Sequence, residues 1–438
     1  MADTIFAVSS GMGRSAVAVI RISGPEAGPL CRSLIGSLPA PRHAQLAALR
    51  DPNTQDILDR GLVLWFPGPH SFTGEDSVEL QIHGGRASIA AVLRVLGAHP
   101  SCRSAEPGEF TKRAFTNGKM DLVAVEGLAD LIDAQTDLQR RQALNQTDGA
   151  LARQIDGLRE SLIEVMALVE ASIDFADEGE APAFEPAQLA ALLQDMRMRL
   201  TDALASYRRA EIVREGFTVL LSGPPNAGKS SLLNHIAGRE AAIVSDIPGT
   251  TRDLLEVTFD LEGLPVVLID SAGIHEAGDE VERIGIERAR SRSEHADLVL
   301  WLSDRAETDV PLVMERDDRQ SIRIRTKTDM GRSTLGGLDV AISTRTGEGV
   351  DTLLALVRER LFAVENFAET AVVTSARQFA ALSDAVAGIN RALMRIAGQP
   401  EVLAEELRSV AVSLGRVSGR IGVEDLLDSI FARFCFGK

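Results

Sequence analysis

The chain has 438 residues, of which 45% are hydrophobic, so it is long enough for two or three domains with buried cores and is unlike a disordered or fibrous protein. Its 46 basic residues are outnumbered by 63 acidic ones, and the net charge of −17 repels nucleic acids and anionic membranes at long range. Any polyanionic partner must therefore be bound through local contacts.

The cysteines and the lack of long apolar runs favour a cytoplasmic location. Cys31, Cys102 and Cys435 lie far apart in sequence, which argues against a disulfide framework and against a zinc site built from paired CxxC motifs. No apolar run approaches the ~18 residues of a membrane-spanning helix, and the first residues lack the basic-then-apolar order of a signal peptide. We therefore expect a cytoplasmic protein.

The first 119 residues have the pattern of a compact α+β domain. Short apolar runs separated by Gly and Pro clusters predict strands at 16–22, 61–66 and 77–82 and a helix at 88–96. This segment carries 12 basic and 10 acidic residues, so it is close to neutral and the negative charge belongs to the rest of the chain.

Two charged residues of these predicted strands are candidates for a binding site. In the run 77–82, alternation puts Val78 and Leu80 on one face, so Glu79 points away from that core and would ordinarily be a surface carboxylate. Arg21 is the only charge in the apolar run 17–22, and from the residues alone a salt bridge at the strand end is its simpler explanation.

Long helical patterns follow, and they return near the C-terminus. From 121 to about 214, and again from 375 to 434, apolar residues repeat at helical spacing, as Leu158, Leu162 and Val165 do. Strand and helix patterns alternate between these segments. Neither helical segment alone clearly makes a closed bundle. We therefore predict an N-terminal domain at 1–119, a helical domain made of 120–214 and 362–438, and an inserted α/β domain at 215–361.

A phosphate-binding loop opens the α/β segment. The predicted strand 217–221 is followed by Gly223-Pro-Pro-Asn-Ala-Gly-Lys-Ser230, which satisfies G-x-x-x-x-G-K-[ST] before a predicted helix. Glycines let backbone N–H groups wrap the phosphates, Lys229 reaches the β- and γ-phosphate oxygens, and Ser230 binds Mg²⁺. An ordinary glycine-rich turn is a poor alternative, because a strand and a helix flank the loop in the required order.

Two further segments are expected to contact the γ-phosphate and Mg²⁺. Asp270-Ser-Ala-Gly273 ends an apolar run, brings a carboxylate beside the metal, and resembles the DxxG element of GTPases. The segment 245–253 lies where a switch that closes over the γ-phosphate is expected. Within it, Thr251 comes 22 residues after Lys229 and would supply a second hydroxyl to Mg²⁺.

Two short elements predict guanine as the base. Thr326-Lys-Thr-Asp329 resembles N-K-x-D, whose Asp binds the two guanine donors, and Ser343-Thr344 resembles the last guanine-contacting element. Thr326 stands for the usual Asn and Thr344 for the usual Ala, so we expect guanine selectivity with looser binding. The residues predicted to bind GTP are Asn226, Ala227, Gly228, Lys229, Ser230, Ser231, Ser245, Asp246, Ile247, Pro248, Gly249, Thr250, Thr251, Asp270, Ser271, Ala272, Gly273, Thr326, Lys327, Asp329, Ser343 and Thr344.

These motifs together carry a family resemblance. The segments P-N-A-G-K-S, G-T-T-R-D and D-S-A-G, with 279–286 and the terminal Phe434-Cys-Phe-Gly-Lys438, resemble the tRNA modification GTPase MnmE (TrmE) family. The match extends into the N-terminal segment at 19–24, 75–85 and 106–119, so it covers essentially the whole chain.

The resemblance implies a multidomain homodimer. Its parts would be an α+β N-terminal domain for tetrahydrofolate binding and dimerisation, an α-helical bundle domain, and an inserted α/β Ras-like P-loop GTPase domain. Family members act with MnmG, which carries FAD, to build the (carboxymethyl)aminomethyl group at C5 of the wobble uridine (U34) of certain tRNAs. The one-carbon unit would come from a tetrahydrofolate derivative, the 5,10-methylene or 5-formyl form. This chain contains no evident GxGxxG fingerprint, which agrees with a flavin on the partner only.

The resemblance also assigns roles to individual residues. Potassium would be held by Asn226, Ser245, Ile247 and Thr250, although from the sequence alone Asn226 is equally well explained as a loop-capping residue. Glu282 would orient the hydrolytic water. The folate site would contain Arg21, Glu79, Lys119 and Lys438. Cys435 would be a catalytic nucleophile or a group that lines the site.

Two other functions remain as alternatives. A ribosome-assembly GTPase switch shares the phosphate loop but usually carries a basic RNA-binding module, which this acidic chain lacks. A stand-alone folate-dependent one-carbon enzyme would turn over folate without a partner protein.

Overall fold

The computed structural model describes residues 3–11, 13–174, 185–238, 242–243, 256–270, 296–304, 320–330, 339–362, 372–419, 430–431, 434 and 437. The chain divides into two compact units, which are described separately. One comprises Met1–Ala129, Gln146–Arg197 and Ala381–Lys438, and the other comprises Asp130–Asn145 and Met198–Ala380.

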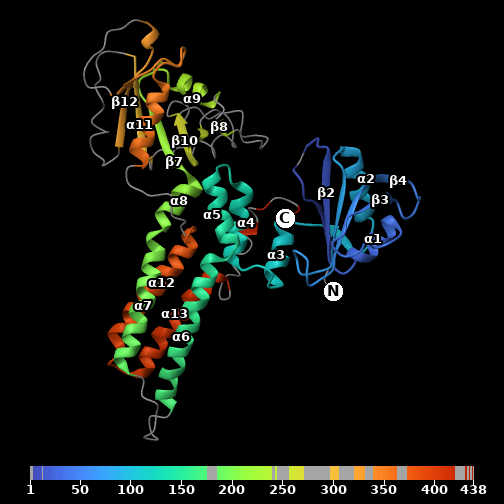
Figure 1. Ribbon diagram of the computed structural model, residues 1–438, viewed down its shortest axis with the longest axis horizontal. Coiled ribbons are helices and arrows are strands. Elements are labelled where there is room, and N and C mark those ends of the chain that lie inside the picture. The colour runs from blue at the N-terminus through green and yellow to red at the C-terminus, as the bar shows by residue number, and fades with distance from the viewer. Residues whose placement is uncertain are drawn as a thin grey trace. The chain divides into compact units, whose positions relative to one another are not determined.

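The first unit begins with a six-stranded sheet of order β3-β4-β5-β2-β1-β6 (Figure 1). Neighbouring strands are antiparallel except for the parallel pair β1 and β6. The strands predicted at 16–22, 61–66 and 77–82 are confirmed as β2, β4 and β5, although β4 begins four residues earlier. The strand bounds are β1 Thr4–Val8, β2 Val17–Ser23, β3 Gln45–Arg50, β4 Ile57–Phe66, β5 Ser77–His83 and β6 Cys102–Ser104.

The two faces of this sheet are covered differently. On one face, α1 (Ala27–Ile35) and α2 (Arg86–Gly97) bury alternate strand residues such as Ile20 and Leu80 in the main core. On the other face, α3 (Glu109–Thr116) buries Phe110 against β1. Arg21 and Glu79 pair across β2 and β5 on this second face, because their neighbours in the strands fill the main core.

Helices form the rest of the first unit. The helix α6 and the helix α13 pack along each other (Figure 1), and the residues predicted to face the bundle core, Leu158, Leu162 and Val165, are buried. At Gly388 a Cβ atom would lie 2.7 Å from Cγ2 of Val410, so the glycine permits close approach of α12 and α13. The helices that lie wholly or partly in this unit are α4 Leu122–Asp133, α6 Ala150–Asp174, α7 Pro186–Ala205, α12 Ala376–Arg395 and α13 Pro400–Ser418.

The second unit is built on a seven-stranded sheet of order β13-β12-β11-β7-β10-β9-β8. The strands from β13 to β10 in this order are parallel, whereas β9 and β8 continue the sheet in antiparallel pairs. Its strands are β7 Phe217–Ser222, β8 Ala242–Ile243, β9 Glu256–Leu261, β10 Leu264–Asp270, β11 Leu298–Ser303, β12 Gln320–Arg325 and β13 Val340–Ala341. Its helices are α5 Asp137–Thr147, α8 Tyr207–Glu215, α9 Lys229–Ala237, the 3₁₀ turn η3 Thr328–Met330 and α11 Val350–Phe362.

The parallel strands bring three loops to one edge of this sheet. β7 lies between β10 and β11, and β12 follows β11. The carboxyl ends of parallel strands form the usual ligand-binding edge of an open α/β sheet. The loops that begin after Ser222, Asp270 and Arg325 therefore start from the same edge.

These observations confirm the predicted fold class: an α+β N-terminal sheet, a helical bundle, and an α/β P-loop sheet that lies between bundle helices in chain order. The exact domain boundaries, 1–119, 120–214 with 362–438, and 215–361, stay a prediction. Among the helices that the structure describes, none combines the length and the apolar composition that a bilayer crossing requires.

Candidate functional site

The phosphate-binding loop joins β7 to α9, as the sequence predicts. Gly223 has a φ of +143°, and a Cβ atom there would lie 2.1 Å from the carbonyl oxygen of Leu302, so only glycine fits. Asn226 and Gly228 also have positive φ values, of 63° and 96°. The chain thus turns into the N-terminus of α9, where free N–H groups and the helix dipole favour an anion.

Lys229 lies across this loop. Its side chain is 7% exposed, and its Nζ donates to the carbonyl oxygens of Gly223, at 3.0 Å, and Pro224, at 3.2 Å. These bonds keep the ammonium group beside the loop, where it can meet phosphate oxygens. Ser231 follows on α9 as an exposed residue.

Oxygen groups suited to a magnesium ion come together at the start of α9 and the end of β10. The Ser230 hydroxyl donates to Oδ2 of Asp270 at 2.8 Å, and Asp270 is only 4% exposed at the end of β10. A hydroxyl and a carboxylate are hard donors of the kind that Mg²⁺ uses together with substrate phosphates. The donor set therefore fits the metal that the GTPase family uses.

The predicted guanine elements are tied to the phosphate loop and to each other. The Thr326 hydroxyl donates to the carbonyl oxygen of Ala227 at 2.7 Å, and Lys327 Nζ donates to that of Asn226 at 2.7 Å. Oδ1 of Asp329 accepts a hydrogen bond of 2.9 Å from the hydroxyl of Ser343. Thr344, the next residue, is half-buried. The structure therefore brings the described guanine residues beside the loop.

Some predicted residues lie outside the described part of the chain. They are Ser245, Asp246, Ile247, Pro248, Gly249, Thr250, Thr251, Ser271, Ala272, Gly273, Glu282, Cys435 and Lys438. Of the predicted potassium ligands, the structure describes Asn226, whose side chain is exposed and whose carbonyl oxygen accepts from Lys327.

A second candidate site lies on the N-terminal sheet. Arg21 donates from Nε and Nη2 to Oε1 of Glu79, at 3.1 and 2.9 Å, and each side chain is 22% exposed. The guanidinium carbon lies 5.2 Å from the ring centroid of Phe72 and 5.7 Å from that of Phe110. The salt bridge expected for Arg21 is thus present, but it lies within the sheet, between two rings that hold the guanidinium in place.

Of the other two residues predicted to bind folate, the structure describes Lys119, which contacts the loop between β4 and β5. The side chain of Lys119 packs against Gly74, and its Nζ donates to the carbonyl oxygen of Pro69 at 3.0 Å. Pro69 and Gly74 lie in the same loop, one before Phe72 in the sequence and one after it. Near the chain end, Gly437 accepts a hydrogen bond of 2.8 Å from the Ser9 hydroxyl. Ser9 in turn donates its N–H to Val19 of β2.

Sequence reasoning missed several residues of these two sites. Phe72 and Phe110 were not singled out, although a phenylalanine within a Ser-Phe-Thr-Gly turn is an unusual apolar residue for a loop. Asp304 was also missed; its Oδ2 accepts from Lys327 Nζ at 2.9 Å and helps to fix that lysine. Its only sequence signal is its position just after a buried strand.

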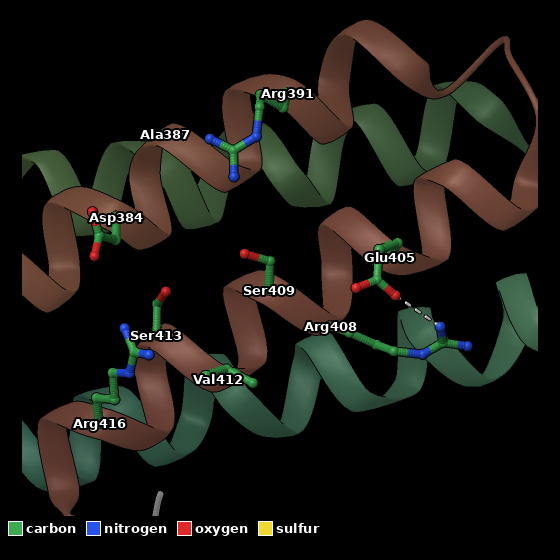
Figure 2. A pocket seen from close by; sticks show the side chains of 9 residues that line it. All are labelled: Asp384, Ala387, Arg391, Glu405, Arg408, Ser409, Val412, Ser413 and Arg416. Carbon is green, nitrogen blue, oxygen red and sulfur yellow. Dashed lines mark hydrogen bonds and ion pairs between the residues drawn. The ribbon is translucent and has the colours of Figure 1, made fainter. Parts of the chain in front are cut away.

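A groove of about 380 Å³ lies between α12 and α13 (Figure 2). Two of its arginines are paired with carboxylates, because Arg391 donates to Glu406 at 2.7 Å and Arg408 donates to Glu405 at 3.1 Å. Arg408 also pairs with Glu170 of α6. These two arginines are therefore neutralised within the protein.

Known proteins match the chain over its whole length. A family model described as the MnmE helical domain matches residues 122–435, and one described as the GTP-binding protein TrmE N-terminus matches residues 4–119. The tRNA modification GTPase MnmE of Methylobacterium sp. (strain 4-46) is 52% identical over 100% of both chains. That of Azorhizobium caulinodans is 51% identical over 100% of this chain and 99% of its own.

Solved structures are similar to part of the chain. The G domain of the T. maritima FeoB iron transporter is 27% identical over 33% of this chain and 98% of its own, with a TM-score of 0.25. The full-length relatives and the two family models carry the assignment: the chain belongs to the tRNA modification GTPase MnmE family.

Proposed function

We propose that this chain hydrolyses GTP to drive the modification of the wobble uridine (U34) of certain tRNAs, in a complex with the FAD-dependent protein MnmG. Family membership makes the chain a tRNA modification GTPase. The proposal adds the nucleotide of the tRNA that is modified, the partner protein and the chemistry of the modification. The observation that carries it is the geometry around the phosphate loop, where Lys229 Nζ bonds to the loop carbonyl of Gly223 and the Ser230 hydroxyl bonds to Asp270 at the end of β10.

The chain's own residues would divide the work at the nucleotide. Lys229 and the loop N–H groups bind and orient the phosphates, and Ser230 with Thr251 would hold Mg²⁺, which neutralises charge that develops on the phosphate oxygens. Glu282 would orient the attacking water. Thr326 and Lys327 would line the base site, and Asp329 would select guanine.

A potassium ion is proposed as an activator. It would be held by Asn226, Ser245, Ile247 and Thr250, and it would supply the positive charge that an arginine finger supplies in other GTPases. The left-handed backbone of Asn226 and its exposed side chain support this role, because they leave the amide oxygen at the surface of the loop.

A tetrahydrofolate derivative, the 5,10-methylene or 5-formyl form, is proposed to bind the N-terminal sheet at Arg21, Glu79, Lys119 and Lys438. The half-buried ion pair and the ring of Phe72 support this proposal, since a pterin offers both hydrogen-bonding edges and a flat apolar face. The bond from Ser9 to Gly437 supports the inclusion of the C-terminal tail.

Cys435 is proposed as the reactive thiol of the chain. Burial raises the pKa of the Cys31 thiol to about 11 and that of the Cys102 thiol to about 11, so neither forms a nucleophilic thiolate near neutral pH. A thiol role at the uridine therefore falls to the third cysteine.

A homodimer and a local tRNA contact complete the proposal. With a net charge of −17, the chain needs phosphate contacts from its near-neutral N-terminal segment and from the partner's surface. We expect tRNA to bind tightly only to the complex with MnmG.

The GTPase step is tested by hydrolysis rates of the purified chain. We expect the rate to fall at least tenfold when sodium replaces potassium at equal ionic strength, and Ser230→Ala to lose most activity in either salt because a metal ligand is gone. Equal rates in the two salts would contradict the potassium role, and full activity of Ser230→Ala would contradict the assigned metal site.

A further inference from the structure

Thr326 stands at the junction of the base site and the phosphate loop. It follows β12, is 4% exposed, and its backbone N–H donates to the carbonyl oxygen of Ser303 at 3.0 Å. Its Cβ, Cγ2 and Oγ1 atoms lie 3.8 to 3.9 Å from the position of a Cβ atom at Gly228. The side chain therefore packs directly on the loop that receives the phosphates.

The single hydroxyl proton of Thr326 already has an acceptor. The hydroxyl donates at 2.7 Å to the carbonyl oxygen of Ala227, a residue that is 0% exposed. A hydroxyl has one proton and otherwise only lone pairs, whereas the asparagine amide of the N-K-x-D pattern has two protons. An asparagine at this position could bond the same carbonyl and still donate to the base; threonine cannot do both.

The edge of guanine that would receive no hydrogen bond from Thr326 is the N7 edge. Guanine presents two acceptors there, N7 and O6, and a threonine oxygen without a free proton offers them no hydrogen bond. The opposite edge of guanine has N–H donors, which a carboxylate can accept. The side chain of Asp329 is 18% exposed, and its Oδ1 accepts a hydrogen bond from the buried hydroxyl of Ser343. Asp329 is therefore held in place and can be reached by a base.

We propose that this chain selects guanine through its N1 and N2 donors without a hydrogen bond to N7, and that Thr326 is the residue that makes the site indifferent to N7. The inference rests on the proposed GTP site and adds the part of the base that the site ignores. The site therefore accepts guanine nucleotides whose N7 is replaced by carbon.

The test compares the binding of GDP, 7-deaza-GDP and IDP by calorimetry. We expect GDP and 7-deaza-GDP to bind within about twofold of each other, and IDP, which lacks the 2-amino group, to bind roughly tenfold more weakly. Thr326→Asn should tighten GDP and create a preference for GDP over 7-deaza-GDP of roughly three- to tenfold. Thr326→Ser keeps one hydroxyl proton, so its ratio for the two nucleotides should stay near one.

Each outcome decides a separate point. A wild-type preference for GDP over 7-deaza-GDP of more than about threefold would overturn the inference, because N7 would then be read. Equal binding by both wild type and Thr326→Asn would overturn the assignment to residue 326. If GDP does not bind at all, the proposed nucleotide site and this inference both fail. If GDP binds strongly and IDP weakly, the proposed nucleotide site is supported whatever the result for 7-deaza-GDP.

Discussion

The ion pair of Arg21 and Glu79 is a candidate binding site because of the groups that surround it. Both bonds of Arg21 go to one oxygen of Glu79, and they use two of the five guanidinium protons. The rings of Phe72 and Phe110 fix the orientation of the guanidinium plane. Among the residues that the structure describes, no other bond occupies the remaining donors of Arg21 or the second oxygen of Glu79, so a ligand can meet them in a fixed geometry.

Replacing Arg21 should weaken folate binding while leaving the fold intact. We expect Arg21→Gln to lower the affinity for 5-formyl-tetrahydrofolate roughly 10- to 100-fold, because charged hydrogen bonds are lost. Titration calorimetry measures this directly. Arg60→Gln, at an exposed arginine of β4, is the matched control and should bind like the wild type. Unchanged binding by Arg21→Gln would remove this residue from the proposed site.

At this scale the sequence allowed some predictions and not others. The positions of Lys229 and Ser230 at the start of α9 could be predicted, because the spacing of the phosphate loop places them within one strand-loop-helix unit. The stacking of Phe72 on Arg21 could not, since it joins residues 51 positions apart through the pairing of the sheet and the path of a loop. The partner of the Thr326 hydroxyl is likewise a contact between distant segments.

The helix α3 is held in place by an ionic network. Arg113 donates to Oδ1 of Asp3 at 2.8 Å, to Glu75 at 3.0 Å and to Glu109 at 3.1 Å. Arg103 of β6 donates to Glu109 at 2.8 Å and also pairs with Asp3. These bonds fix the helix that carries Phe110, so the network supports the ring that packs on Arg21.

This network should make the first unit sensitive to acid. Burial raises the pKa of Glu109, but hydrogen bonds from Arg103 and Arg113 outweigh it, so the pKa lies below the ordinary 4.5. A lowered pKa means that the ionised carboxylate stabilises the fold above about pH 4.5, and that this contribution is lost as the pH falls through the lowered value. We expect Glu109→Gln to cost roughly 1–3 kcal/mol at pH 7 and progressively less below pH 4.5.

Urea unfolding between pH 7 and pH 3 measures this difference. Glu106→Gln, at an exposed carboxylate three residues earlier, is the control and should change the free energy of unfolding little at any pH. A cost of Glu109→Gln that stays constant across the range would show that its charge does not support the helix.

Elements with a clear period were predictable from the sequence. The strand at 77–82 and the helix at 88–96 were confirmed within two residues at each end, because each has one apolar face against the main core. The start of β4 was not, since its first residues, from Ile57 on, pair only with β3 at the sheet edge and are partly exposed. Residues that pair only with an edge strand and stay partly exposed do not need to alternate between apolar and polar, so the sequence carries little signal of such a strand.

At the scale of the whole molecule, the order of elements along the chain sets how the GTPase segment is connected. The seven-stranded sheet lies in sequence between α8 and α12. Both covalent connections of the GTPase segment therefore lead into helices.

The most direct test of the account is nucleoside mass spectrometry of bulk tRNA from a bacterial strain that lacks its own family member. We expect the full chain to restore the modified wobble uridine and Ser230→Ala to fail, because in the proposed function GTP hydrolysis at the phosphate loop drives the modification. The strain's own protein, expressed from the same vector, provides the reference level. Restoration by Ser230→Ala to that level, or no restoration by the full chain where the reference succeeds, would contradict the account.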